Sequence, residues 1–142
     1  MNVTIPDLTN AECGEIAITA AEGGIGYWSQ METYRPSRWS PDSQHELYVK
    51  GKAPSSSVEV PDTFVFYTIH EMNDDEDGYK EEGIDITPVV IRRGFELAIT
   101  KARKDLVADV LSEAREDWMG SIDSDAAEVI VQCGVLGEIK WG

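Results

Sequence analysis

The first regular pattern along the chain is a helical spacing of apolar side chains near the N-terminus. Thr9, followed three residues later by Glu12, forms a capping box at its start. The apolar positions then recur at intervals of three, four and seven residues, as on one stripe of a helix. They are Cys13, Ile16, Ala17 and Ala20. Gly23 and Gly24 end the stripe, because glycine readily takes the left-handed conformation that follows a helix. The pattern predicts a helix over residues 10–22.

The middle of the chain changes to an alternation of apolar and polar residues. The clearest strand is predicted over residues 63–71, where apolar side chains occupy both faces. Such a pattern favours a central strand, or an oligomer contact on the second face. Residues 46–50 predict a shorter strand. A polar turn at residues 73–78 precedes a partner strand, expected from Tyr79 through Ile86.

Helical spacing returns after this region. Thr87 and Pro88 predict a helix start, because proline suits the first helical position after an N-cap residue. The helix is expected over residues 89–104, and Gly94 inside it costs about 1 kcal/mol relative to alanine. Residues 105–118 continue the spacing. The pattern fits either one long bent helix or two helices.

The last predicted helix is apolar on nearly every side. Asp123 is its expected N-cap, the apolar positions lie within residues 124–136, and Gly137 ends it. A helix that is apolar all round is buried, either in the core or against another subunit. Ile139 and Trp141 then predict an edge strand.

Together these elements predict a single α+β domain over residues 1–142. A small antiparallel sheet from the middle of the chain is expected to pack with an N-terminal helix and two or three C-terminal helices. The length of 142 residues, or 15.7 kDa, suits one domain better than two. The two-faced strand and the apolar last helix predict a homodimer or a higher homo-oligomer.

Charge narrows the range of partners. Lys and Arg total 12 against 27 Asp and Glu, so the formal net charge is -15. A surface this negative repels phosphate backbones and anionic membranes, so direct nucleic-acid binding and membrane binding are not expected. The chain shows no membrane-spanning stretch and no signal-peptide pattern, and its two cysteines, Cys13 and Cys133, indicate reduced thiols. We therefore expect a cytoplasmic protein.

Aromatic, glycine and arginine residues gather at one place in this acidic chain. Tyr27 and Trp28 directly follow a glycine-rich stretch that includes Gly24 and Gly26, and Arg35 lies a few residues further on. Aromatic faces and guanidinium groups suit planar bases and phosphates, and glycines permit a close approach of the backbone to a ligand. The competing interpretation is that Trp28 fills the core.

A second basic cluster lies on the helix predicted after Pro88. It consists of Arg92 and Arg93 with Lys101, Arg103 and Lys104, and the two arginines are candidates for phosphate contacts. The competing interpretation is a solvated helix face, with charge pairs to Glu96 and Asp105.

Motifs for catalysis and metal binding are weak. Residues 73–78 resemble the start of a calcium loop, but the twelfth position is Ile84 instead of a bidentate glutamate. His45 and His70 lie in no metal-binding spacing. The chain has no G-x-S-x-G elbow, and its carboxylates are too numerous for one acid–base pair to be singled out. No metal, no cofactor and no enzymatic activity is expected.

Two segments resemble a group of small phage and prophage proteins. Residues 22–28 read E-G-G-I-G-Y-W after the first helix, as in that group. The group ends in a helix that opens with an Asp-containing turn and is followed by G-E-I-x-x-G, which here are residues 122–127 and 137–142. In size and layout the chain is also similar to the Thoeris anti-defence sponges, small oligomeric phage proteins that sequester cyclic ADP-ribose signals without cleaving them.

This resemblance implies a function and a set of site residues. It implies an accessory counter-defence protein that captures a small nucleotide signal without catalysis. Tyr27 and Trp28 would stack on adenine, and Arg35, Arg92 or Arg93 would meet the phosphates. The alternative, suggested by the charge alone, is an acidic mimic of DNA that inhibits a host DNA-binding protein.

Overall fold

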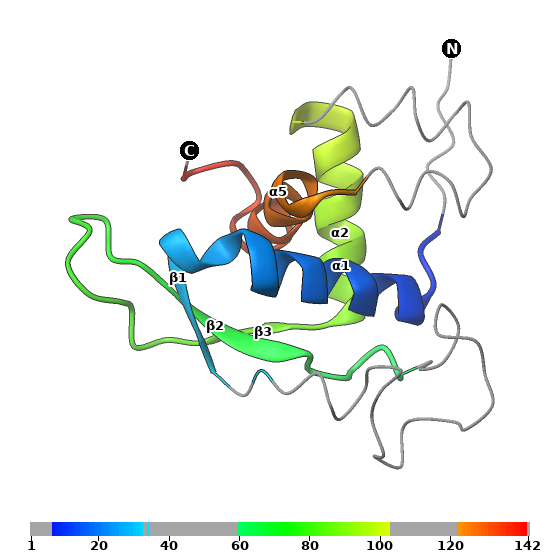
Figure 1. The fold of residues 1–142 in the computed structure, drawn as a ribbon, viewed down its shortest axis with the longest axis horizontal. Helices are drawn as coiled ribbons and strands as arrows, with labels where there is room; N and C mark the ends of the chain where they lie inside the picture. Colours follow the sequence, from blue (N-terminus) through cyan, green and yellow to red (C-terminus); the bar gives the residue numbers. More distant parts are fainter. Residues whose placement is uncertain (1–6, 33, 35–59, 103–121, 142) are drawn as a thin grey trace.

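A computed structural model of the chain describes residues 7–32, 34, 60–102 and 122–141, which form an α+β fold (Figure 1). The predicted fold class is confirmed. The elements in chain order are α1 (Asn10–Gly23), the 3-10 turn η1 (Ile25–Tyr27), β1 (Ser29–Glu32), β2 (Tyr67–Glu71), β3 (Ile84–Ile86), α2 (Pro88–Leu97), the π-helical turn η4 (Ala98–Ala102) and α5 (Ser124–Leu136).

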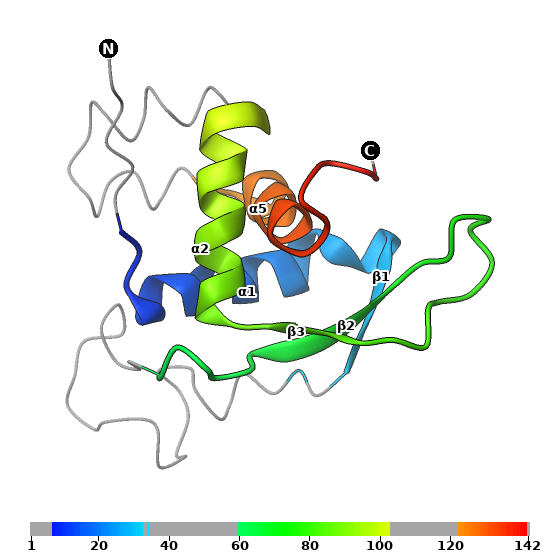
Figure 2. The same cartoon turned by 180° about the vertical axis from the view of Figure 1, so that it is seen from behind.

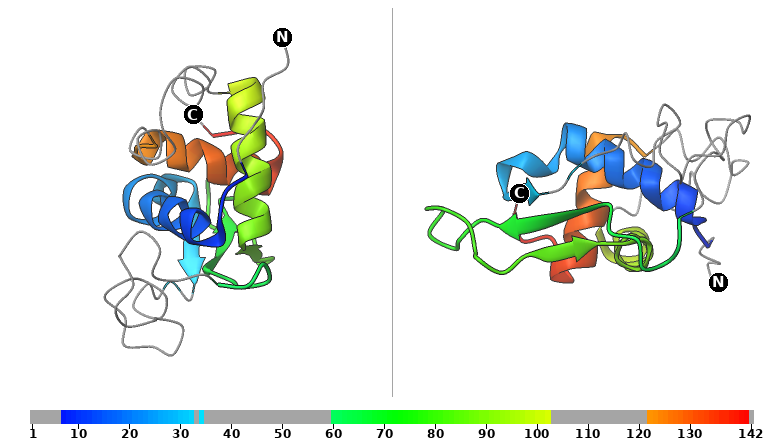
Figure 3. Two further views of the ribbon diagram at one scale, coloured as in Figure 1. Left: turned by 90° about the vertical axis from the view of Figure 1, so that its right-hand side faces the viewer. Right: turned by 90° about the horizontal axis from the view of Figure 1, so that it is seen from below.

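The described strands form an antiparallel sheet in the order β1-β2-β3. Figure 3 shows α1, α2 and α5 packed on one side of this sheet. Along β2, Tyr67, Ile69 and Glu71 are buried, while Thr68 and His70 between them are partly exposed. The alternation indicates a sheet with a helix-covered face and a polar outer face.

Two of the expected strands differ from those in the structure. β2 begins at Tyr67 instead of Thr63, so Phe64 precedes the strand and does not build a second apolar face. β1 follows η1 directly and no pattern predicted it, because four residues reading Ser-Gln-Met-Glu carry too little alternation. The sheet therefore takes one strand from the N-terminal part of the chain. The strand predicted at residues 46–50 lies outside the described residues.

The helix ends agree closely with their sequence signals. The Thr9 hydroxyl accepts from the Glu12 N–H at 3.1 Å, and the Glu12 carboxylate accepts from the Thr9 N–H at 2.8 Å, so the capping box is formed. Asp123 caps α5 by accepting from the Ala126 N–H at 2.8 Å. Gly137 follows α5 with φ of 78°, the left-handed conformation expected of a C-terminal glycine.

α5 lies at the centre of the helical layer. It packs against both α2 and α1, and Figure 2 shows it end-on, beside α2 and above α1. Its contact with α2 is made by backbone at two glycines: a Cβ on Gly94 would lie 1.9 Å from the Ile130 carbonyl oxygen, and one on Gly134 would lie 2.3 Å from the Val90 carbonyl oxygen. Most of the apolar surface of α5 is thus covered within the chain, and Gly94 is explained by close helix packing.

Three further expectations can be compared with the structure. Residues 139–141 form no strand. The backbone N–H groups of Lys140 and Trp141 instead donate to the side-chain oxygen of Gln132. Residues 73–78 form a hairpin turn, in which the Asn73 N–H donates to the Gly78 carbonyl at 2.9 Å. Cys13 and Cys133 are buried free thiols. Residues 105–118 lie outside the described part of the chain. In the described part, no helix has the length and apolar character needed to cross a membrane.

Candidate functional site

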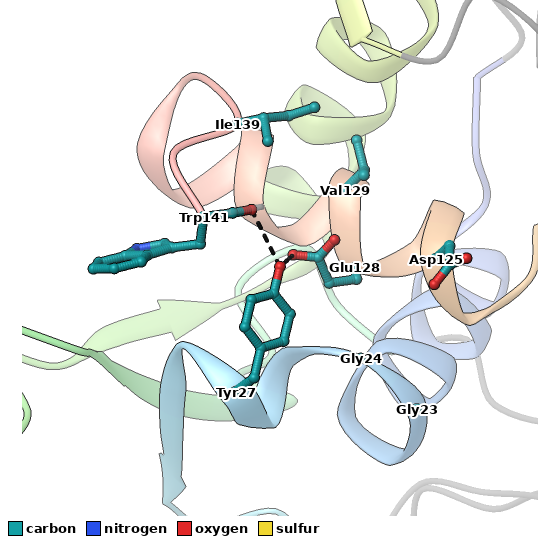
Figure 4. A pocket seen from close by; sticks show the side chains of 8 residues that line it. All are labelled: Gly23, Gly24, Tyr27, Asp125, Glu128, Val129, Ile139 and Trp141. Atoms are coloured by element: carbon teal, nitrogen blue, oxygen red, sulfur yellow. Dashed lines mark hydrogen bonds between the residues drawn. The ribbon is translucent and has the colours of Figure 1, made fainter. Parts of the chain in front are cut away.

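A pocket of about 510 Å³ opens where the turn after α1 meets α5 and the C-terminal segment (Figure 4). Three separate parts of the chain form its walls. The lining residues are Gly23, Gly24, Tyr27, Asp125, Glu128, Val129, Ile139 and Trp141. α5 supplies one wall because its first two turns face η1, while the segment after Gly137 turns back over the helix.

The Glu128 carboxylate organises this pocket. One of its oxygens, Oε1, accepts hydrogen bonds from the Tyr27 hydroxyl at 3.0 Å, the Trp28 indole N–H at 3.0 Å and the Gln132 amide at 2.7 Å. The residue is only 8% exposed. Burial and the hydrogen bond to Glu128 together raise the pKa of Tyr27 to about 12. The hydroxyl therefore stays protonated and donating over the physiological range.

Gln132 fixes the C-terminal wall of the pocket. Its Oε1 accepts from the backbone N–H groups of Lys140 at 2.6 Å and Trp141 at 2.5 Å, and its Nε2 donates to the Trp141 carbonyl at 3.2 Å. The same carbonyl lies 3.1 Å from the Tyr27 hydroxyl, which shares its proton with Glu128. A fully buried side chain thus replaces the strand partner that this segment lacks.

A second buried carboxylate, Glu71, holds Trp141 from the sheet side. It accepts from the Lys80 ammonium at 2.8 Å, the Lys140 ammonium at 2.9 Å and the Trp141 indole N–H at 2.9 Å. Burial acts to raise the pKa of Glu71, but these donors outweigh it and lower the pKa to about 2. Lys140 also pairs with Asp74 at 2.7 Å. The Trp141 wall is therefore anchored to both β2 and α5.

The structure places the predicted residues of the first segment in different surroundings. Gly24 and Tyr27 line the pocket, and Tyr27 is 51% exposed. A Cβ on Gly26 would meet no atom within 4 Å, so this glycine faces open space. Trp28 is completely buried. Because its ring faces are covered by core residues, Trp28 has no free face for stacking and instead supports Glu128 through its N–H.

The predicted arginines lie away from the pocket. Arg92 donates to the Leu8 carbonyl at 3.0 Å and to Asp62 at 3.3 Å, and it also contacts the Asn10 side chain. Arg93 donates to the Gly134 carbonyl near the end of α5. Neither residue lines the pocket. Their guanidinium groups connect segments of the fold, and among the described residues the carboxylate paired with Arg92 is Asp62. Arg35 lies outside the described residues.

Sequence reasoning missed the acidic wall of the pocket. Asp125 and Glu128 are two of the 27 acidic residues of the chain, but Glu128 and Gln132 stand four residues apart within a helix that is mostly apolar after Asp125. That spacing puts both polar side chains on one face of α5, which is the signal that identifies the site. The described lining residues include two carboxylates and no basic group.

The pocket presents hydrogen-bond acceptors from its carboxylates and from the Trp141 carbonyl, together with the ring of Tyr27. Among the described residues, no group of three or more His, Cys, Asp or Glu side chains is placed to hold a metal ion.

Comparisons of the chain with protein-family models, with curated proteins and with solved structures gave no match.

Proposed function

We propose that the protein is a non-catalytic binding protein that captures a small ligand with a planar ring in the pocket between η1, α5 and the C-terminal segment. One observation carries this proposal. The segments by which the chain resembles small phage and prophage proteins meet at the same pocket: residues 22–28 contribute Tyr27, residues 122–127 contribute Asp125, and residues 137–142 contribute Trp141.

The specific form of the proposal is the sequestration of a nucleotide signal of the cyclic ADP-ribose type, as counter-defence in the host cytoplasm. The half-exposed ring of Tyr27 offers a stacking face for a base. The exocyclic amino group of a base would donate to the carboxylates of Asp125 or Glu128. Phosphates would remain outside the pocket, because its described lining holds two acidic residues and no basic one.

Binding of nucleosides and nucleotides to the purified protein tests this proposal. Adenosine, ADP-ribose and cyclic ADP-ribose are titrated in a calorimeter and in thermal unfolding experiments, because a ligand that binds the folded state raises the melting temperature. The ligands are then recovered and analysed by chromatography. We expect at least one of them to bind and to be returned unchanged. Conversion to a product would contradict the non-catalytic function.

A matched pair of variants assigns the binding to the pocket. Val129→Trp places a large side chain in the pocket wall and is expected to abolish binding. Val89→Trp makes the same change at a 53% exposed position on α2, outside the pocket, and is expected to leave binding unchanged. Circular dichroism checks that both variants fold. Equal binding by the two folded variants would show that the ligand lies elsewhere.

The second candidate, an acidic mimic of DNA, has one specific observation in its favour. Acidic side chains gather on the hairpin between β2 and β3, which extends beyond the helical layer (Figure 1). They are Asp74, Asp75, Glu76, Asp77, Glu81 and Glu82. A pull-down from a host lysate tests this function, with a variant that carries Asn and Gln at these six positions as the control. Recovery of no DNA-binding protein by the unaltered chain would contradict it.

A further inference from the structure

The buried carboxylate of Glu128 has no counter-charge within the described part of the chain. Its Oε1 receives three donors, which are all neutral: a phenol, an indole and an amide. No described residue donates to its second oxygen, Oε2, and Figure 4 shows this oxygen directed away from Tyr27. No buried side-chain oxygen among the described residues lacks a hydrogen-bond partner, so Oε2 is accessible from the pocket. A positive charge placed there would compensate the charge of this largely buried carboxylate.

We propose that the group entering this pocket is a planar, positively charged nitrogen group, such as an amidinium, a guanidinium or a protonated nitrogen heterocycle. This inference rests on the proposed function and names the chemical class of the ligand end that the pocket recognises. The cation would donate to Glu128 Oε2, with Asp125 as a second acceptor on the same helix and the Tyr27 ring as a cation–π partner.

A comparison with Glu71 in the same protein supports the assignment. Both carboxylates are buried, at 4% and 8% exposure. Glu71 is paired with the ammonium groups of Lys80 and Lys140. Lys140 also pairs with Asp74 and lies 5.2 Å from the centre of the Trp141 ring, so its charge is already engaged on the sheet side. The fold thus supplies cations to one buried carboxylate and leaves the other facing a pocket.

The N-terminus of α5 does not compensate the negative charge of Glu128. The positive end of α5 lies near its first turn, but the Asp123 carboxylate already accepts from the Ala126 N–H there. Asp125 in that turn adds a further negative charge beside the pocket. The net charge of -15 also attracts cations to the surface as a whole. Each of these charges favours a cationic group over an anionic one at the ligand end that enters the pocket.

A set of three probes of the same shape tests the inference on the unaltered protein. Benzamidine, benzamide and benzoate share one ring and differ mainly in charge, which is positive, neutral and negative. We expect benzamidine to bind in a calorimetric titration, benzamide to bind roughly tenfold more weakly or worse, and benzoate not to bind, because a charge-assisted hydrogen bond is lost. The affinity for benzamidine should fall as salt is added.

Matched variants locate the charge that is recognised. Glu128→Gln keeps the size and one acceptor oxygen but removes the charge, and it is expected to weaken benzamidine binding roughly tenfold or more. Asp125→Asn, at an exposed position, should weaken it by a smaller factor. Glu96→Gln changes the net charge equally on the exposed side of α2 and should have no effect. If Glu128→Gln fails to fold, Asp125→Asn and the three probes still decide the matter.

The outcomes separate this inference from the proposed function. If benzamide or benzoate binds as well as benzamidine, and Val129→Trp abolishes that binding, the pocket is a ligand site but the charge assignment is wrong. Failure of benzamidine to bind at millimolar concentration also overturns the inference, while the nucleotide titrations still test the pocket. Benzamidine binding that Val129→Trp and Glu128→Gln leave unchanged would place the cation elsewhere and contradict the inference.

Discussion

At the scale of single residues, buried carboxylates account for the main electrostatic features of this protein. Among the described residues, Glu71 has two ammonium partners and a pKa of about 2, whereas the donors to Glu128 are all neutral. The stability that Glu71 contributes is complete above its unfolded pKa of about 4.5, and it is lost as the pH falls from there towards 2.

Replacing Glu71 should therefore destabilise the protein in a pH-dependent way. We expect Glu71→Gln to lower the free energy of unfolding by about 1–3 kcal/mol at neutral pH, because two partly exposed lysines and the Trp141 N–H lose a buried acceptor. The difference from the unaltered protein should shrink below pH 4.5. Urea unfolding at several pH values measures both effects, and a difference that does not depend on pH would contradict the electrostatic explanation.

His70 is a second titrating residue, on the outer face of the sheet. Its Nε2 lies 2.8 Å from the Glu32 carboxylate and its Nδ1 lies 2.9 Å from the Lys80 carbonyl, so the protonated ring donates to both. The hydrogen bond to Glu32, followed by that to the Lys80 carbonyl, raises the pKa of His70 above 6.5. Its contribution to stability is complete below pH 6.5 and is lost as the pH rises through the folded-state pKa.

An NMR titration of the His70 imidazole measures this shift directly. We expect a pKa above 6.5 in the unaltered protein and a lower pKa in Glu32→Gln, because the negative charge next to Nε2 is removed. Asp85→Asn changes a carboxylate on another strand of the same sheet and serves as the control. A His70 pKa at or below 6.5 in the unaltered protein would show that the ion pair is not formed in solution.

At the scale of elements, the crossing of α2 and α5 depends on Gly94 and Gly134. Gly94→Ala should lower the free energy of unfolding by about 2–4 kcal/mol, because the added methyl group meets the Ile130 backbone and no side-chain rotation relieves the contact. Gly26→Ala is the matched control, since its Cβ would meet no atom within 4 Å. It should be neutral or stabilise by up to about 1 kcal/mol. Chemical denaturation measures both free energies of unfolding, and an equal loss in Gly94→Ala and Gly26→Ala would contradict the packing explanation.

Sequence patterns predicted the elements whose signals are local. The capping box at Thr9, the Thr87–Pro88 start and the Asp123 cap fix helix ends through side chain to backbone bonds within one turn. β1 escaped prediction because it is short and its pairing with β2 joins residues about forty positions apart. The candidate site could be predicted only in part: Gly24 and Tyr27 were identified, but the burial of Trp28 and the acidic wall depend on how α5 packs against η1.

At the scale of the whole molecule, the folded chain covers features that in the sequence favoured an oligomer. α5 packs against α1 and α2, and the outer face of β2 carries Thr68 and His70. The expected homodimer or higher homo-oligomer stays a prediction, with light scattering as its measurement. Part of the net charge of -15 lies in the pocket. There, acidic acceptors stand beside an aromatic ring and a C-terminal wall held by Gln132.

Mapping a ligand on the unaltered protein by NMR tests the central claim most directly. In a titration with benzamidine, we expect shifts of the backbone amides of Tyr27, Val129 and Trp141, which belong to the pocket, with Val89 and Val65 unchanged. Saturating shifts confined to these pocket residues would agree with a cation-binding site between η1, α5 and the C-terminal segment. No shifts at these residues, or shifts confined to the acidic hairpin between β2 and β3, would contradict it.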